Sequence, residues 1–413
     1  MKKIYCSLVS LLLAAVLLFS CVSCGLQVSA AELSAGYTRT ATETGELTEA
    51  FQTAMADFSV KLFQQSVTKD MQNDLVSPLS AVMCLALLAN GADGNTLAQM
   101  EAALGMDIDT LNRCLYAYTA ALYRADDCKV HLADSIWYRD DEATLRINET
   151  FLQTNADWYN AQIYAAPFDA STVKDINAWC KKQTDGMIDK IVDSLDEEDL
   201  MYLINALVFD AKWSNKYEKS DVEDGLFHNS NGSEKNVKML SSEETVYLCG
   251  SSAQGFSKNY AGDKYSFVAL LPDEGTDIYD YIDSLSGEVW QNLWNGREHT
   301  PVHVKMPEFT YSTEMNLVDS LKALGMTDMF GSGADFSKMG TASAGSLYCG
   351  EVRQKTFIQV DRNGTKAAAV TWGTMKATAM LLNIFIELDR PFVYAIVDNE
   401  TGLPLFLGAV TNL

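Results

Sequence analysis

The chain has 413 residues, of which 48% are hydrophobic, and it carries a formal net charge of −24 at pH 7. This length and apolar content are enough for one large core or two modest ones. The strong negative charge argues against nucleic acid, heparin-like polyanions and anionic membranes as partners, because each of these repels an acidic surface.

The N-terminal residues 1–30 predict an export signal. Lys2 and Lys3 supply a positive start, and Leu8–Phe19 supplies an apolar core that is too short to span a membrane as a helix. No stop-transfer pattern follows. We therefore expect a protein that acts outside the cytoplasm, and this style of signal is typical of bacteria.

Two kinds of processing fit this signal. Residues 28–30 (VSA) before Ala31 suit ordinary signal peptidase, which would release the protein. Ser20-Cys21 or Ser23-Cys24 resembles a bacterial lipoprotein box, which would anchor the protein to the cell surface. Neither box is a full match, so release is the favoured alternative. Residues 31–47 then form a polar lead segment.

Cysteine usage indicates neither a metal site nor a disulfide framework. Of nine cysteines, three lie in the N-terminal segment, and the other six have no ligand-like or framework spacing. Most of the six are predicted to be small buried hydrophobic residues: Cys84, Cys114, Cys128, Cys180, Cys249 and Cys349.

Three helices are predicted in the first third of the chain. Thr48–Val67 carries its apolar residues at helical spacing, which indicates an amphipathic helix. Pro78 suits the first turn of a second, apolar helix, and Gly91 suits its C-terminal cap. A third helix at Cys114–Arg124 is apolar and has no basic stripe.

The remainder of the chain is rich in predicted strands. No repeat, low-complexity tract or linker interrupts it, so we expect one domain over residues 48–413 and an α+β fold. The predicted strands are His131–Tyr138, Leu203–Trp213, Val237–Leu240, Phe267–Pro272, Val302–Phe309, Val352–Val360, Phe392–Val397 and Leu405–Val410.

The segment Asp361–Leu382 suits two conformations. Its Ala-rich, Gly-broken composition favours an exposed loop or a frayed helix. As a strand, however, it would place both lysines on one face and an uncharged, mostly small stripe on the other. That stripe consists of Thr365, Ala367, Ala369, Thr371, Gly373, Met375 and Ala377.

This segment resembles the hinge and reactive loop of the serpins. Gly364–Thr371 reads GTKAAAVT and precedes Arg390-Pro391-Phe392 by about twenty residues. Further serpin-like runs lie along the chain from about residue 48 to its end: residues 73–80, 91–105, 176–188, 306–309 and 321–336.

The resemblance implies a serpin fold, with a large central mixed sheet, further sheets, about eight to nine helices and an exposed reactive loop at about residues 362–384. It also implies inhibition of serine proteases by a suicide mechanism. The cleaved loop inserts into the central sheet as a new strand and traps the acyl-enzyme.

Site residues follow from the same resemblance. The expected hinge comprises Gly364, Thr365, Ala367, Ala368 and Ala369. Trp213 corresponds to the tryptophan under which the loop begins to insert. The shutter, where the sheet opens, corresponds to Ser77, Ser80, Asn205 and Gln354.

Two counts place the cleaved bond differently. With the spacing usual in inhibitory serpins, counting residues forward from Gly364 places the cleaved bond at Thr378-Ala379. Counting back from Pro391 places it at Met380-Leu381. We choose Thr378-Ala379, because the length of the loop segment between Gly364 and the cleaved bond decides how far the attached protease is carried. Its small side chains suit an elastase-like or subtilisin-like target, whereas the fallback bond would admit chymotrypsin-like enzymes.

The chain departs from the family pattern at three positions. Inhibitory relatives usually carry glutamate where this chain has Arg362, and a glutamate is also common at Lys366. Gln354 replaces the shutter histidine. These changes bear on the timing of sheet opening.

The rival function is that of a non-inhibitory serpin, a binding or carrier protein whose loop never inserts. It predicts bulky or charged residues on the inward stripe, where this chain has no charge and only Met375 is large. This pattern favours the inhibitor.

No enzyme constellation is present in the sequence. His299 and His303 are four residues apart, but Pro301 between them prevents a zinc-binding helix. We expect no cofactor, no metal and no catalytic activity. The expected partners are serine proteases, without nucleic acid or a heparin-like activator, and the protein is expected to be a monomer.

Overall fold

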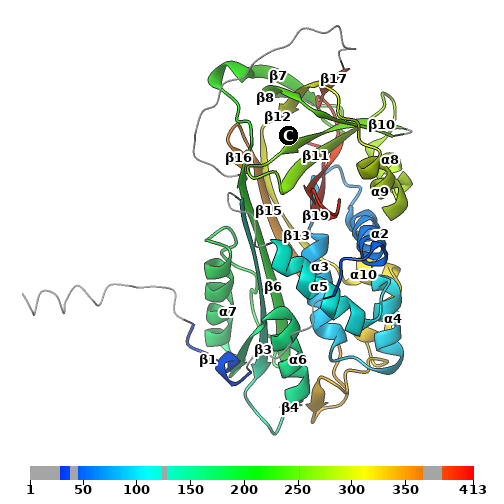
Figure 1. Cartoon of the computed structure of the whole chain (residues 1–413). Coiled ribbons are helices and arrows are strands. Elements are labelled where there is room, and N and C mark those ends of the chain that lie inside the picture. Colours follow the sequence, from blue (N-terminus) through cyan, green and yellow to red (C-terminus); the bar gives the residue numbers. More distant parts are fainter. Residues whose placement is uncertain (1–27, 38–44, 123–127, 251, 366–383) are drawn as a thin grey trace, which may run out of the picture.

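The computed structural model describes residues 28–37, 45–122, 128–250, 252–365 and 384–413 (Figure 1). Within them the chain forms nine α-helices and five sheets. The central sheet has the order β1-β5-β3-β6-β16 and is mixed, because β3 is parallel to β5 and antiparallel to β6. Its strands are β1 (Ala31–Glu32), β3 (Cys128–Arg139), β5 (Gln162–Ala166), β6 (Met201–Lys212) and β16 (Gly364–Thr365).

A two-stranded ladder, β13 (Phe309–Asn316) with β15 (Arg353–Val360), runs along the central sheet (Figure 1). The sequence predicted one strand over Val302–Phe309, but the chain leaves one sheet at Pro307 and joins another at Phe309. Both halves bury apolar side chains, so the hydrophobic pattern does not reveal the change of sheet.

Two larger sheets pack at the end of the molecule where β16 lies (Figure 1). A six-stranded sheet has the order β2-β19-β18-β11-β10-β9, and a four-stranded sheet has the order β17-β12-β8-β7. Their strands are β2 (Asp74–Val76), β7 (Val222–His228), β8 (Glu234–Glu244), β9 (Val246–Cys249), β10 (Ala253–Asn259), β11 (Tyr265–Pro272), β12 (Val302–Pro307), β17 (Ile384–Glu387), β18 (Phe392–Asp398) and β19 (Pro404–Val410). A small pair, β4 (Leu145–Ile147) with β14 (Gly340–Ala342), lies at the opposite end.

Most helices cover one side of the sheets, whereas α7 lies apart beside β3 (Figure 1). They are α2 (Glu49–Ser66), α3 (Pro78–Ala89), α4 (Gly94–Leu104), α5 (Ile108–Leu122), α6 (Glu149–Tyr159), α7 (Ala170–Gln183), α8 (Ile278–Ser284), α9 (Gly287–Asn295) and α10 (Val318–Ala323). The helix count, the mixed sheet and the α+β class confirm the predicted fold.

The capping residues agree with the sequence at helix starts but not at one helix end. The Thr48 side chain accepts a hydrogen bond from Phe51 N–H, and Pro78 occupies the first turn of α3. α3 ends where the sequence predicted, at Ala89, but its C-cap is Asn90 in an ordinary right-handed conformation, and Gly91 does not act as a left-handed cap. Gly91 instead permits a close approach, since a Cβ there would lie 2.7 Å from Met339 Cβ.

The predicted polar lead segment contributes to the fold. β1 pairs with β5 at the outer edge of the central sheet. Just before it, Ser29 Oγ and Ala30 N–H both donate to the buried carboxylate of Asp175 on α7, at 2.7 and 2.8 Å. Within the described residues, no helix is long and apolar enough to cross a membrane.

Five of the six cysteines after the N-terminal segment have described side chains; these five are free, and they fit the burial prediction only in part. Cys114 and Cys180 are buried, Cys84 and Cys349 are half-buried, and Cys249 is exposed.

Candidate functional site: the hinge and shutter of the central sheet

The central sheet is incomplete along β6. One edge of β6 is hydrogen-bonded to β3 from Met201 to Ala211. The other edge pairs only with the two residues of β16, at Gly364↔Lys212 and Thr365↔Ala211. In the described part of the chain, β6 and β15 belong to different sheets, so the rest of this edge has no ladder partner.

A tight turn places β16 on this edge. Asp361 and Gly364 exchange backbone hydrogen bonds of 3.2 and 3.3 Å, so β15 turns directly into β16. The Asp361 carboxylate accepts a hydrogen bond from Asn363 N–H at 2.7 Å, which is typical of an Asx turn.

Gly364 is required by both conformation and space. Its φ of 143° lies in a region that side chains rarely adopt. A Cβ would also lie 2.3 Å from Ala211 O and 2.5 Å from Lys212 Cα, both backbone atoms of β6. Only glycine therefore allows the chain to enter the sheet here.

Trp213 lies directly beneath this turn. It is 1% exposed, and its ring stacks on Tyr260 with centroids 4.6 Å apart. Its indole N–H donates to Asp361 O at 2.8 Å, and its backbone N–H donates to Asn363 O at 3.2 Å. The tryptophan thus links the end of β6 to the start of the loop.

A buried ion pair supports Trp213. Lys258 on β10 is 1% exposed and bonds Glu244 on β8 at 2.7 Å. Its ammonium group also lies 4.4 Å from the ring centre of Tyr217 and 5.5 Å from that of Trp213. Burial lowers the pKa of Lys258, but Tyr217 and Glu244 outweigh burial and raise it overall, so Lys258 stays charged.

Arg362, the first departure from the family pattern, has a partner of opposite charge. Its Nε and its backbone N–H both donate to Glu308 Oε1, at 3.3 and 3.2 Å. The pair is partly exposed, so its contribution to stability is modest. The positive charge at this position is therefore accommodated locally.

Three of the four predicted shutter residues meet below β15. Gln354 accepts from Ser77 N–H and donates to Ser77 O, both at 2.8 Å. Ser77 Oγ donates to Leu405 O at 2.9 Å and accepts from Ser80 N–H at 3.3 Å. Glutamine thus provides a donor and an acceptor here without a titrating group.

Asn205, the fourth shutter residue, is bonded elsewhere. Its Nδ2 donates at 2.9 Å to Asp134 Oδ1 on the neighbouring strand β3. Asp134 is 3% exposed, and burial raises its pKa to about 7, although the hydrogen bond from Asn205 lowers it. Sequence reasoning missed Asp134, Lys258 and Glu308. The signal for Asp134 was an acid inside a strand predicted to be buried.

The predicted hinge residues beyond Thr365 lie outside the described residues. These are Ala367, Ala368 and Ala369. The same holds for both candidate reactive bonds, Thr378-Ala379 and Met380-Leu381. Their roles stay predictions.

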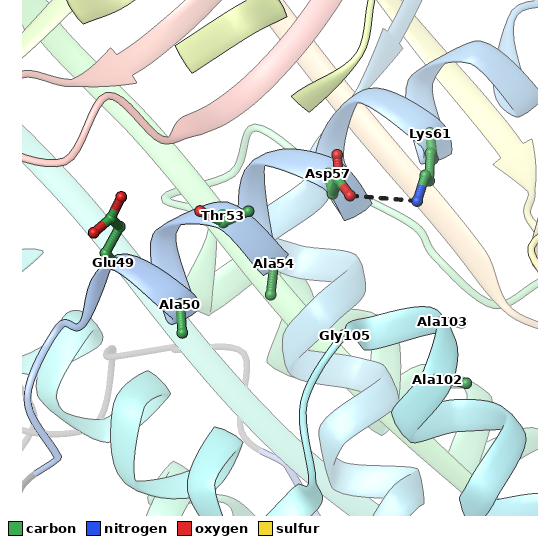
Figure 2. Close-up of a pocket in the computed structure, with 9 residues that line it drawn as sticks. All are labelled: Glu49, Ala50, Thr53, Ala54, Asp57, Lys61, Ala102, Ala103 and Gly105. Atoms are coloured by element: carbon green, nitrogen blue, oxygen red, sulfur yellow. Dashed lines mark hydrogen bonds and ion pairs between the residues drawn. The ribbon is translucent and has the colours of Figure 1, made fainter. Parts of the chain in front are cut away.

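Two open hollows lie on the surface of the described residues. One of about 530 Å³ lies between α2 and α4, is lined mainly by short side chains and contains the exposed Asp57–Lys61 ion pair at 3.4 Å (Figure 2). The other, of about 390 Å³, is lined by Glu308, Arg362 and neighbouring residues at the hinge. Among the described residues no cluster of side chains could hold a metal ion.

Comparisons with known proteins agree with this geometry. The family model "Serpin (serine protease inhibitor)" matches residues 53–413. Leukocyte elastase inhibitor A of Rattus norvegicus is 29% identical over 383 residues, covering 88% of this chain and 100% of the relative. Serpin I2 of Homo sapiens is 26% identical over 375 residues, covering 86% of this chain and 90% of the relative.

Solved structures give the same result. The thermophilic serpin tengpin in its native state is 44% identical with a TM-score of 0.88, covering 94% of this chain and 100% of that structure. Tengpin in its latent state has a TM-score of 0.81 at 44% identity, covering 90% of this chain and 100% of that structure. The chain belongs to the serpin family, whose members are mostly protease inhibitors.

Proposed function

We propose that this chain is a suicide-substrate inhibitor of serine proteases. The protease serine attacks a loop carbonyl, an ester bond to the enzyme forms and the peptide bond breaks. The freed N-terminal arm then inserts between β6 and β15 before water hydrolyses the ester. The protease, still attached to the arm, is carried along and distorted.

The observation that supports this proposal most strongly is the pairing of β16 with the vacant edge of β6. If the register Gly364↔Lys212 continues, Ala367 lies opposite Phe209 and Met375 opposite Met201, at the far end of β6. Directly opposed residues in antiparallel strands share a face. Ala211 and Phe209 face the main core, so the uncharged stripe from Thr365 onward would also face it.

The same register accounts for Lys366. It would lie opposite Asp210, on the outer face of the sheet. A lysine is favourable there because opposite charges attract across neighbouring strands. This departure from the family pattern is therefore compatible with insertion.

Insertion would release a large free energy. Each added ladder hydrogen bond contributes about 1 kcal/mol net, and a strand as long as β6 would also bury side chains. The sum is on the order of 10 kcal/mol, which is comparable to the stability of a whole domain. Such a gain can displace and deform a bound protease.

We propose elastase-like or subtilisin-like proteases as targets, with cleavage at Thr378-Ala379. The similarity to leukocyte elastase inhibitors supports this class. Because α5 contains a single basic residue, Arg113, we propose a monomer that needs no heparin-like activator.

We propose that the protein acts outside a bacterial cell, either secreted or anchored as a lipoprotein. The contacts of Ser29 and Ala30 with Asp175 favour processing upstream of Ser29, at Cys21 or Cys24. Cleavage before Ala31 would remove both donors from a buried carboxylate.

The alternative is a non-inhibitory serpin that acts as a binding or carrier protein. A likeness to thyroxine-binding globulin supports only the shared fold, at 22% identity and a TM-score of 0.77, covering 88% of this chain and 98% of that structure.

The test is incubation with a panel of elastase-like, subtilisin-like, trypsin-like and chymotrypsin-like proteases, followed by denaturing electrophoresis. A band at the summed mass, absent with a protease whose serine is blocked, is expected because the trapped ester is covalent. Clean loop cleavage by every protease without such a band would favour the carrier.

A further inference from the structure

The Asp134–Asn205 pair at the shutter is incompletely bonded. Asn205 donates to Asp134 Oδ1, but Asn205 Oδ1 is buried and has no hydrogen-bond partner among the described residues. A buried polar atom without a partner costs free energy, so it indicates a missing donor. The Asp134 carboxyl, which already bonds the same side-chain amide, can become that donor by binding a proton.

The surroundings of Asp134 provide no charge to balance a carboxylate. Cys84 on α3 and Tyr159 on α6 are the titratable groups that interact with it, since its charge raises the pKa of each further. Burial is the main cause of both shifts and raises the pKa of Cys84 to about 12, so both groups are neutral at physiological pH. β6 contributes Asn205, and no cation among the described residues acts on Asp134.

A proton on Asp134 would complete the pair. The protonated carboxyl donates its O–H to Asn205 Oδ1 while Asn205 Nδ2 donates to the other carboxyl oxygen, which gives two complementary hydrogen bonds. Without the proton, Asn205 Oδ1 and a carboxylate oxygen of Asp134 are two acceptors that face each other, and the negative charge is buried without a positive charge beside it. The proton comes from solvent and returns to it.

We propose that Asp134 is a positioning residue for strand insertion: with its proton it holds β6 against β3, and without its proton this attachment of β6 is weakened. Weaker attachment admits water to the carboxylate, which lowers the cost of its charge. The part of this inference that concerns insertion rests on the proposed function, because the Asp134–Asn205 pair includes a residue of β6, the strand beside which the arm would insert.

The direction of the pH effect follows from linkage. The pKa of Asp134 is about 7 in the folded protein, above its ordinary value near 3.9 in an unfolded chain. The folded state therefore binds the extra proton between about pH 4 and 7. The stability it contributes is present at low pH and is lost as pH rises to about 7, after which the loss is constant.

The experiment compares urea unfolding of the wild type, Asp134→Asn and Asp134→Ala from about pH 5 to about 8.5, followed by tryptophan fluorescence. In Asp134→Asn an amide N–H replaces the proton at every pH. The unfolding constant of the wild type, divided by that of Asp134→Asn, should rise close to tenfold per pH unit from about pH 5 to 7 and then level off. Asp134→Ala should be destabilised relative to Asp134→Asn by a constant amount.

Dividing the unfolding constant of the wild type by that of the variant cancels the effect of other titrating groups. Asp74, whose pKa is raised to about 6 by burial, titrates in all three proteins and cancels. If the ratio of unfolding constants does not change with pH, the proposal is overturned, because an Asp134–Asn205 pair that needs no proton is merely structural. The independent readout is the infrared difference spectrum, wild type minus Asp134→Asn, at about pH 5.5: it should contain the band of a protonated carboxyl, because Asp74 contributes equally to both proteins and only Asp134 differs.

The effect on inhibition is read in the same way. The fraction of wild-type loop cleaved without trapping, divided by that of Asp134→Asn with the same protease at each pH, should change with the same midpoint. If the ratio of cleaved fractions does not change with pH while the ratio of unfolding constants does, the role of Asp134 in insertion is rejected and its effect on stability stands. Absence of any trapped complex rejects the proposed function and leaves the urea result valid.

Discussion

Gly364 is the residue at which the start of the loop meets the central sheet. Its left-handed backbone and its 2.3 Å approach to Ala211 O make two separate demands for glycine. These demands can be tested separately, because Gly345 has a similar φ of 137° with no atom within 4 Å of its Cβ position.

We expect Gly364→Val to abolish the pairing of β16 and to turn the inhibitor into a substrate, since the arm can no longer start insertion. Gly345→Val adds comparable backbone strain without the clash, so it should lower stability but leave trapping intact. The measurement is the number of inhibitor molecules consumed per protease inactivated. Equal behaviour of the two variants would show that the close approach to β6 is unimportant.

Lys258 and Glu244 allow a test of the support beneath Trp213. Lys258→Met should destabilise the protein by about 3–5 kcal/mol, because it leaves the Glu244 carboxylate, 7% exposed, without its cation. Adding Glu244→Gln should recover a large part of that loss. Urea denaturation measures both, and a double variant no more stable than the single one would contradict the ion-pair account.

At the scale of elements, the register of β16 with β6 predicts which face of the loop turns inward. Thr365→Arg should convert the inhibitor into a substrate, because an unpaired charge would enter the core at the first inserted position and cost several kcal/mol. Lys366→Arg is the matched control, since its guanidinium would face outward, opposite Asp210. Equal stoichiometry of inhibition for both variants would refute the assigned face.

The cleaved bond is a second prediction about the loop. Mass spectrometry of the peptide released on inhibition should find a fragment that starts at Ala379, because that arm length fits the forward count from Gly364. A fragment starting at Leu381 would support the fallback bond. One starting at Ala377 would reject both, since it implies cleavage after Lys376.

Secondary-structure elements followed from sequence where one local rule determines them. Thr48 and Pro78 are at helix starts because capping and proline geometry are local. Gly91 was misassigned because its role is to make room for Met339, which is distant in the chain. The change of sheet at Glu308 was likewise not predictable, because buried apolar residues lie on both sides of it, at Met306 and Phe309.

At the scale of the whole molecule, the fold was predictable from the sequence, but the hydrogen-bond and ion-pair partners within the site were not. The motifs around Gly364 and Ser77 carried the resemblance, whereas the partners Arg362–Glu308 and Asp134–Asn205 depend on strand registers between distant segments. Such pairs cannot be read from spacing along one chain. Within the described residues, the same registers leave one edge of β6 without a ladder partner beyond β16, and that edge is the basis of the proposed mechanism.

The most direct test of that mechanism is hydrogen–deuterium exchange of β6 before and after the loop is cleaved. If the arm inserts, backbone amides of Met201–Asp210 on the free edge should become strongly protected, because they gain ladder partners. Peptides from β19, already paired with β2 and β18, serve as the internal control. Unchanged exchange of β6 in the fully cleaved protein would contradict insertion and, with it, the proposed inhibitory mechanism.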